Sequence, residues 1–189
     1  MHSYGRDFRH TSYIHLALAL ITYLIYEALG RLPLPADVPF HPFITLTIFG
    51  ALELVFNRWA WRLLCLVKPL HIHDFGGTYS GQIRAEKDTS FPVTITIKQN
   101  WSDIEIDFES GEATSKSFSA SITKDRLARG QVEIVYNYYA QGTHEGDERV
   151  GAHYGTAMLV RQARGKKLEG QYYTEGIRER FGRIAVERK

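Results

Sequence analysis

The fold of this chain is decided at residues 13–29, which read YIHLALALITYLIYEAL and hold no charged residue before Glu27. At about 1.5 Å of rise per residue, a helix of this length just spans the roughly 30 Å hydrocarbon core of a bilayer. A second apolar run at 43–56 contains Glu53 and reaches spanning length when it is extended to Val67. We therefore expect two transmembrane helices joined by a Pro-rich connection. A buried helical pair in a soluble protein is the alternative that these lengths leave open.

Charge and cysteine content exclude several classes of protein. A formal net charge of +2 over 189 residues gives no electrostatic reason to expect binding of polymeric nucleic acid. The single cysteine, Cys65, excludes an internal disulfide and a cysteine metal site within one chain. The first apolar run lacks a small-residue cleavage site and is followed at once by the second. We therefore expect it to be retained rather than removed as a signal peptide.

Basic residues are unevenly distributed around the two runs. The connection at 30–42 holds only Arg31, whereas the outer ends of the runs are flanked by Arg6, Arg9, Arg58, Arg62 and Lys68. Basic residues favour the cytoplasmic side of a membrane. The pattern therefore predicts a multi-pass protein with both termini in the cytoplasm. It comprises a two-helix transmembrane region at 1–68 and a cytoplasmic ligand-binding domain at 69–189.

Beyond Pro69 the hydrophobic period changes to about two, and turn residues recur every eight to twelve positions or so. Alternation directs Ile104 and Ile106 inward and the neighbouring carboxylates, Glu105 among them, toward water. Eight short strands favour a small closed antiparallel barrel, because closure removes exposed edges. The expected strands are Gly77–Ala85, Val93–Trp101, Asp103–Glu109, Lys116–Thr123, Gln131–Tyr139, His153–Arg161, Lys167–Thr174 and Gly182–Arg188.

Several inward positions of these strands carry polar or aromatic side chains where a purely structural barrel would use aliphatic ones. On the sixth strand either the row of His153 or the row of Thr156 faces inward, and the sequence does not choose between them. A single tyrosine commonly packs a core, but the group together suggests a pocket for a flat, hydrogen-bonding ligand. The candidate ligand-binding residues are Tyr79, Gln99, Trp101, Tyr136, Tyr138, His153, Thr156, Tyr172 and Thr174, with Arg178 and Arg180 as candidates for phosphate contacts.

Catalysis has little support in the sequence. His71 and His73 share one strand face, but no third metal ligand is evident. His153 could pair with an acidic residue of the 145–148 loop as a general base. No phosphate-binding loop, dinucleotide fingerprint or hydrolase motif occurs. We expect no enzyme and no metal. In the second apolar run, Glu53 is a packing or pore-facing residue of an oligomer, or else it lies protonated or near the interface.

Five pieces of sequence, in this order and spacing, resemble one known family. They are 76–81 (GGTYSG), 97–102 (IKQNWS), the serine-rich 115–121, 153–157 (HYGTA) and 168–174 (LEGQYYT). Together with the two apolar runs, they are similar to the two-transmembrane β-barrel effectors of bacterial CBASS anti-phage systems. That family usually shows a threonine followed closely by an arginine and a glycine. Here Thr174 precedes both Arg178 and Arg180, and either fits the pattern.

The resemblance implies an activity and a set of partners. A cyclic dinucleotide would be the activating ligand of the cytoplasmic barrel, with no other cofactor. The protein would assemble as a homo-oligomer in the bacterial inner membrane, and its hairpins would disrupt the lipid bilayer, killing the infected cell and limiting phage spread. A functional link to a cyclic-oligonucleotide synthase is also implied. Two alternatives remain: a membrane-tethered barrel that binds a lipophilic molecule, and a membrane-bound hydrolase using His153 or a His71/His73 metal.

Overall fold

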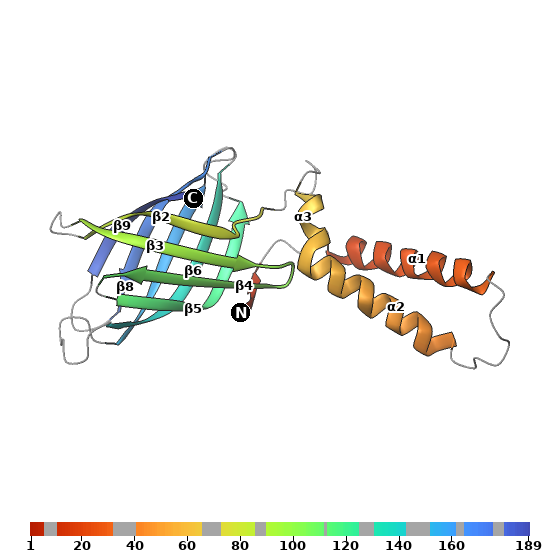
Figure 1. The fold of residues 1–189 in the computed structure, drawn as a ribbon. Helices are drawn as coiled ribbons and strands as arrows, with labels where there is room; N and C mark the ends of the chain where they lie inside the picture. Colours follow the sequence, from red (N-terminus) through yellow and green to blue (C-terminus); the bar gives the residue numbers. More distant parts are fainter. Residues whose placement is uncertain are drawn as a thin grey trace. The chain divides into compact units, whose positions relative to one another are not determined.

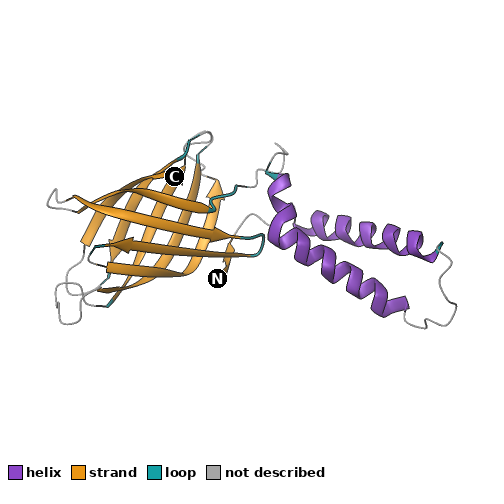
Figure 2. Cartoon of the chain, in the orientation of Figure 1, coloured by secondary structure: helices purple, strands orange, loops and turns teal. Residues whose placement is uncertain are grey.

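The computed structural model describes residues 1–5, 11–31, 41–65, 73–85, 90–111, 113–124, 131–142, 152–161, 165–175 and 180–189. The chain divides into two compact units, a helical one over Asp7–Ile72 and a strand-rich one over Met1–Arg6 and His73–Lys189. Figure 2 separates the two by secondary structure. The strand-rich unit therefore includes the first residues of the chain, which the sequence pattern assigns to the region of the helices.

The helical unit consists of two apolar segments. The first is α1 (Thr11–Gly30); the second runs without a break through α2 (His41–Val55), the π-helical turn η2 (Phe56–Ala60) and α3 (Trp61–Leu64). Ser12–Gly30 and Phe43–Leu64 are each long and apolar enough to cross a membrane, and only 11% and 6% of them is buried. The core helix of a soluble protein would be mostly buried. The predicted pair of helices able to span a membrane is thus confirmed.

Arginine and tryptophan side chains pair near the end of the second segment. The Arg58 guanidinium lies 5.5 Å from the ring centroid of Trp59, and that of Arg62 lies 5.2 Å from Trp61. Such pairs suit the interfacial layer of a bilayer, where aromatic rings are enriched and an arginine can direct its charge toward water. The extension of the second run through these residues is therefore physically reasonable. Val67 and Lys68 lie outside the described residues.

The strand-rich unit is a closed barrel in which all neighbouring strands are antiparallel except β1 and β5 (Figure 1). Each strand from β2 to β8 pairs with the next strand in the sequence, and β9 pairs back with β2. The predicted closed barrel is confirmed, but the described residues form nine strands instead of eight, and one pair, β1 with β5, is parallel. Its strands are β1 (His2–Gly5), β2 (Gly77–Ala85), β3 (Ser90–Gln99), β4 (Asp103–Ser110), β5 (Ala113–Lys124), β6 (Val132–Gly142), β7 (His153–Arg161), β8 (Lys167–Thr174) and β9 (Arg180–Arg188).

A short strand that the sequence does not predict, β1, completes the wall between β4 and β5. These two strands pair directly only over residues 107–109 and 114–116. Beyond that region β1 lies between them, antiparallel to β4 with His2 opposite Ile104 and parallel to β5 with Tyr4 opposite Ala120. β5 is irregular at Ser117/Ser119, next to the point where β1 enters. The start of the chain is therefore part of the barrel wall.

Aliphatic side chains fill the interior of the barrel. Ile95, Ile104, Ile134 and Leu159 are fully buried, as expected for a small barrel whose lumen is just wide enough for side chains. On β7, the row that includes Leu159 faces inward and the row of Thr156 faces outward. This register settles the choice that the sequence leaves open.

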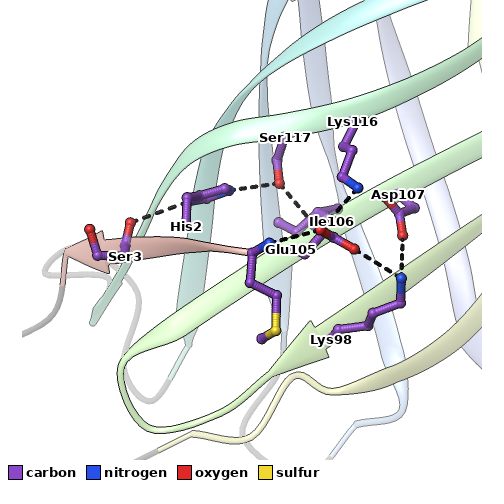
Figure 3. A network of polar contacts seen from close by, with 9 residues as sticks. His2, Ser3, Lys98, Glu105, Ile106, Asp107, Lys116 and Ser117 are labelled. Atoms are coloured by element: carbon purple, nitrogen blue, oxygen red, sulfur yellow. Dashed lines mark hydrogen bonds and ion pairs between the residues drawn. The ribbon is translucent and has the colours of Figure 1, made fainter.

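Glu105 corrects one expectation, because its side chain is only 9% exposed although it lies in the predicted water-facing row. Its carboxylate accepts hydrogen bonds from the Met1 amine (2.9 Å) and from the ammonium groups of Lys98 (2.9 Å) and Lys116 (3.0 Å), as Figure 3 shows. The physical reason is β1, which pairs with β4 beside this residue and brings the amine over it. These cations lower the pKa of Glu105 to about 2.

Candidate functional site

The directions of the strands divide the candidate residues between two ends of the barrel. At one end, β2 begins at Gly77, β3 ends at Gln99 and β7 ends at Arg161. The chain segments that lead to and from the helices, 1–5 and 73–76, also join the barrel here. We call these two segments the tethers and this end the tether end. At the opposite end, β7 begins at His153 and β8 ends at Thr174.

At the tether end, Gln99 binds both tethers. Its side chain is buried in the inward row of β3, its Oε1 accepts the backbone N–H of Phe75 (2.8 Å), and its Nε2 donates to the Tyr4 hydroxyl (3.2 Å) and to the His73 carbonyl (3.2 Å). Because a backbone N–H can only donate, the network fixes which end of the amide is oxygen. Gln99, which the sequence analysis selected as a ligand-binding residue, therefore hydrogen-bonds to other parts of the same chain.

Tyr79 and Arg161 hold the second tether from the barrel wall. The Tyr79 hydroxyl donates to the carbonyl oxygen of Phe75 (2.9 Å), and burial raises the pKa of this phenol. The Arg161 guanidinium lies 4.3 Å from the centroid of the fully buried Phe75 ring and donates to the carbonyl of Asp74 (2.6 Å). The tether at 73–76 is thus anchored inside this end of the barrel.

Trp101 also lies at the tether end, in the turn between β3 and β4, and is 7% exposed. Its turn is held by Asn100, whose Oδ1 accepts the backbone N–H groups of Ser102 (2.9 Å) and Asp103 (2.6 Å). Side chains that hydrogen-bond their own backbone two or three residues on make compact turns. This turn fixes the position of Gln99, the residue just before it.

At the opposite end, tyrosines from adjacent strands gather on the inner wall. On β6, the rings of Tyr136 and Tyr138 lie 6.0 Å apart, and Tyr138 meets the His153 ring of β7 edge-on at 6.4 Å. The Tyr138 hydroxyl donates to the carbonyl of Tyr173 (3.5 Å) on β8. Tyr138 is 7% exposed, while His153 is only partly buried. Three neighbouring strands thus bring together aromatic faces and polar groups that the sequence analysis selected one strand at a time.

Two glycines make room for these rings. A Cβ at Gly155, directly opposite Tyr138, would overlap with the phenol ring of that residue. A Cβ at Gly182 would overlap with the ring of Tyr172 in the same way. Glycine without a side chain allows a cross-strand ring to lie flat over the backbone. The orientation of both tyrosines is therefore set by residues of the neighbouring strands.

The buried phenols of this end remain protonated at neutral pH. Burial, the largest cause, raises the pKa of both Tyr136 and Tyr138, and the neighbouring Tyr172 raises that of Tyr138 further. A neutral phenol donates a hydrogen bond and presents a flat ring, but it is a poor nucleophile or base. The chemistry of this end therefore suits recognition of a ring-bearing ligand with hydrogen-bond acceptors.

The remaining candidates are only partly placed. Thr174 is buried and lies opposite Arg180, the first residue of β9, whose side chain is not described. Arg178 lies outside the described residues, as do His71 and the acidic loop at 145–148. Thr156 is a correction, since its exposed hydroxyl donates to Asn137 on the outer face (2.6 Å). Among the described residues, no group of three His, Cys, Asp or Glu is arranged to hold a metal ion.

The outer face near the opposite end carries exposed aromatic rings. Phe118 on β5 and Tyr154 on β7, 53% and 56% exposed, lie edge to face at 5.9 Å, and Tyr154 also contacts Tyr139 at 5.1 Å. Tyr173 and Phe181, which pair across β8 and β9, are exposed on the same side of the wall. We call these five residues the aromatic row. An exposed apolar patch of this kind commonly marks an interaction surface.

In the helical unit, Glu53 faces the other helix. Its carboxylate lies 3.8 Å from Nε2 of His15 on α1, and both side chains are about half exposed. A charged group in an apolar helix is costly and is usually paired across a helix contact. From the sequence, Glu53 was expected to be a packing or pore-facing residue of an oligomer, or to lie protonated or near the interface, and His15 was not identified as its partner. The alternation of hydrophobic residues gives no signal for such a pair.

The chain was compared with known proteins. A search of curated proteins found no match. A family model described as the Cap15 cyclic dinucleotide receptor domain matches residues 70–188, which is more than half of the chain. The chain therefore belongs to the Cap15 family of CBASS effectors, and its barrel corresponds to the cyclic dinucleotide receptor domain of that family.

Proposed function

We propose that this protein is a CBASS effector of the bacterial inner membrane that binds a cyclic dinucleotide at the opposite end of its barrel, oligomerises and disrupts the bilayer. The observation that carries the site is the cluster of Tyr138, His153, Tyr172 and Thr174 on adjacent strands. Tyrosine rings supply stacking faces for bases, and their neutral hydroxyls supply donors for base or phosphate oxygens. Arg180, opposite Thr174 in β9, is the proposed phosphate contact, with Arg178, two positions earlier in the sequence, as a second.

The proposal assigns a different role to Tyr79 and Gln99. Their polar groups hold the tether at 73–76, as the hydrogen bonds to Phe75 indicate. We therefore place the ligand away from them, at the end where the polar loops after β6 and β8 begin. Because the effector only binds its ligand, no bond is made or broken, and the ligand acts by favouring one state of the protein over another.

Membrane topology follows from the path of the chain. Both tethers belong to one barrel, so both must lie on the same side of any membrane that the helices cross. A pair of spans satisfies this condition and a single span does not. With the basic flanks at 6–9 and 58–62, we propose that barrel and termini are cytoplasmic.

The membrane step rests on Glu53 and on the aromatic row. In an assembly of several copies, the Glu53 and His15 pairs of neighbouring hairpins supply the polar groups around which a hydrated defect can form. The aromatic row offers the barrels an exposed apolar surface through which copies associate. No enzymatic activity is part of this proposal.

Binding is tested with the intact chain in lipid nanodiscs, titrated calorimetrically with a panel of cyclic dinucleotides and, separately, with fatty acids. We expect saturable binding of at least one cyclic dinucleotide. Tyr172→Ala should weaken it at least about fivefold, because one stacked base contributes roughly 1–3 kcal/mol. The matched control is Gln171→Ala, the preceding residue of β8, which is exposed on the outer face and lies outside the aromatic row. Absence of dinucleotide binding, or fatty-acid binding in its place, would reject the proposal.

The membrane step is tested by dye release from liposomes that contain the intact chain. We expect the dinucleotide bound in the calorimetric experiment to increase release in wild type, and the inactive nucleotides of the same panel to have no effect. A ligand that binds but causes no release would separate the receptor function from membrane disruption and would refute the second.

A further inference from the structure

Two segments far apart in the sequence meet on one side chain. The first tether precedes α1 and the second follows α3, so the helical unit is inserted between them along the chain. Tyr4 of the first tether and Phe75 of the second are 71 positions apart, yet Gln99 hydrogen-bonds both. The two covalent links between barrel and helices therefore end on a shared contact inside the barrel.

We propose that Gln99 couples the receptor barrel to the helical unit by holding both tethers at once, so that loosening this junction releases both links together. The proposal rests on the function proposed above and adds the route by which the barrel controls the helices. Ligand binding, on this view, shifts the population from a state in which the junction is closed to one in which it is open.

The geometry of Gln99 suits this role. Its amide is buried and makes three hydrogen bonds of 2.8–3.2 Å, one to each of Tyr4, His73 and Phe75. A buried amide that loses one partner is left with an unsatisfied group, which favours making all three contacts together or none. Cooperative contacts of this kind give a junction two discrete states.

Strand β7 links the contacts of Gln99 at the tether end to the proposed ligand site at the opposite end. Arg161, which covers Phe75, is the last residue of β7, and His153 is the first residue of the same strand. Tyr4 donates to the backbone carbonyl of Asn100 (3.4 Å), in the turn that directly follows Gln99. A displacement of β7 or of this turn therefore reaches the tethers through direct contacts, without passing through a loop.

The first test measures the tethers themselves by hydrogen exchange with mass spectrometry on the intact chain in nanodiscs, without ligand. Gln99→Leu keeps the size of the side chain and removes its hydrogen bonds. We expect both 1–5 and 73–76 to exchange at least about tenfold faster than in wild type. Gln82→Leu makes the same change at an exposed position of β2 and should leave both segments at wild-type rates. Acceleration of one segment alone, or of neither, would overturn the proposal.

The second test measures coupling by dye release from liposomes. We expect Gln99→Leu to leak at least about fivefold more than wild type without ligand, and to bind the dinucleotide within about twofold of the wild-type affinity. Wild-type leakage with wild-type dependence on ligand would overturn the coupling role, and so would loss of dinucleotide binding, which would place Gln99 in the ligand site. If wild type itself neither binds dinucleotide nor leaks, the proposed function fails. The exchange experiment then still tests whether Gln99 holds both tethers.

Tyr4→Phe provides a second variant if Gln99→Leu does not fold. It removes the hydroxyl that accepts from Gln99 and keeps the buried ring. We expect faster exchange in both 1–5 and 73–76 and an intermediate increase in ligand-independent leakage. Wild-type behaviour in both measurements would contradict a shared junction.

Discussion

Replacement of Glu105 by Gln removes the charge of a buried carboxylate and keeps the shape of the side chain, although one acceptor oxygen becomes an NH2 donor. Glu105 contacts three cationic groups at 2.9–3.0 Å. Its pKa falls from 4.5 to about 2, mainly through the hydrogen bonds from Lys98, the Met1 amine and Lys116. A change of this size corresponds to about 3 kcal/mol at 1.36 kcal/mol per unit of pKa.

Exposure of the partners reduces this figure. The side chains of Lys98 and Lys116 are 55% and 64% exposed, so water and salt screen their charges. We expect Glu105→Gln to lower the free energy of unfolding by about 1–2 kcal/mol at pH 7, equivalent to roughly 5 °C in the melting temperature of a barrel of this size. Asp107→Asn is the graded comparison. Asp107 contacts Lys98 at 3.0 Å but is more exposed, at 26%, and its replacement should cost under half as much.

The stabilisation by Glu105 should depend on pH in a definite direction. The pKa of Glu105 is lower in the folded protein than in the unfolded chain, so its ionised form stabilises the fold, fully above about pH 4.5 and progressively less toward pH 2. The melting temperatures of wild type and Glu105→Gln, followed by circular dichroism in nanodiscs, should therefore converge as the pH falls through this range. The gap should also narrow in 1 M salt. Equal melting temperatures at pH 7, or a gap unchanged at pH 3, would refute the reasoning.

Three further predictions concern the opposite end of the barrel, the aromatic row and the helices. Gly155→Ala should lower the free energy of unfolding by about 1–3 kcal/mol and weaken dinucleotide binding, because the new Cβ overlaps with the ring of Tyr138. The control is Gly111→Ala, which has open space around its Cβ and should change neither melting temperature nor affinity. Replacing both Phe118 and Tyr154 by Ser should reduce ligand-induced oligomers in mass photometry at unchanged affinity; undiminished assembly would place the contact elsewhere. Glu53→Leu should bind ligand normally but reduce dye release severalfold, and equal release would mean that the helices only anchor the barrel.

The barrel could be predicted from the sequence because period-two alternation is a local property. It located each of the strands β2 to β9, and the bounds of β2, β7 and β8 are as predicted. β1 could not be predicted, since four residues before an apolar run carry no periodic signal and their partners lie about a hundred positions away. The burial of Glu105 was missed for the same reason, because β1 is what covers it.

For the candidate site, the alternation of residues along each strand identified the inward side chains but not the groups that they contact. Gln99 and Tyr79 were correctly placed in the interior, yet their hydrogen bonds go to Phe75, whose position depends on how the chain enters the barrel. The choice between the rows of His153 and Thr156 required the register of β7 against its neighbours. Tyr138 and Tyr172 were found because polar aromatic residues stand out in an inward row of aliphatic ones.

The place of β1 in the barrel affects the order in which the molecule is completed during synthesis. β1 leaves the ribosome before both apolar helices, whereas its partners on β4 and β5 are made only after them. Once the strands β2 to β9 have paired, closing the wall must still bridge the helical unit, which is about 65 residues long. A paired hairpin, with His15 beside Glu53, shortens this loop to about 30 residues and lowers the entropic cost of closure by about 0.7 kcal/mol. Pairing of the two helices therefore favours completion of the barrel.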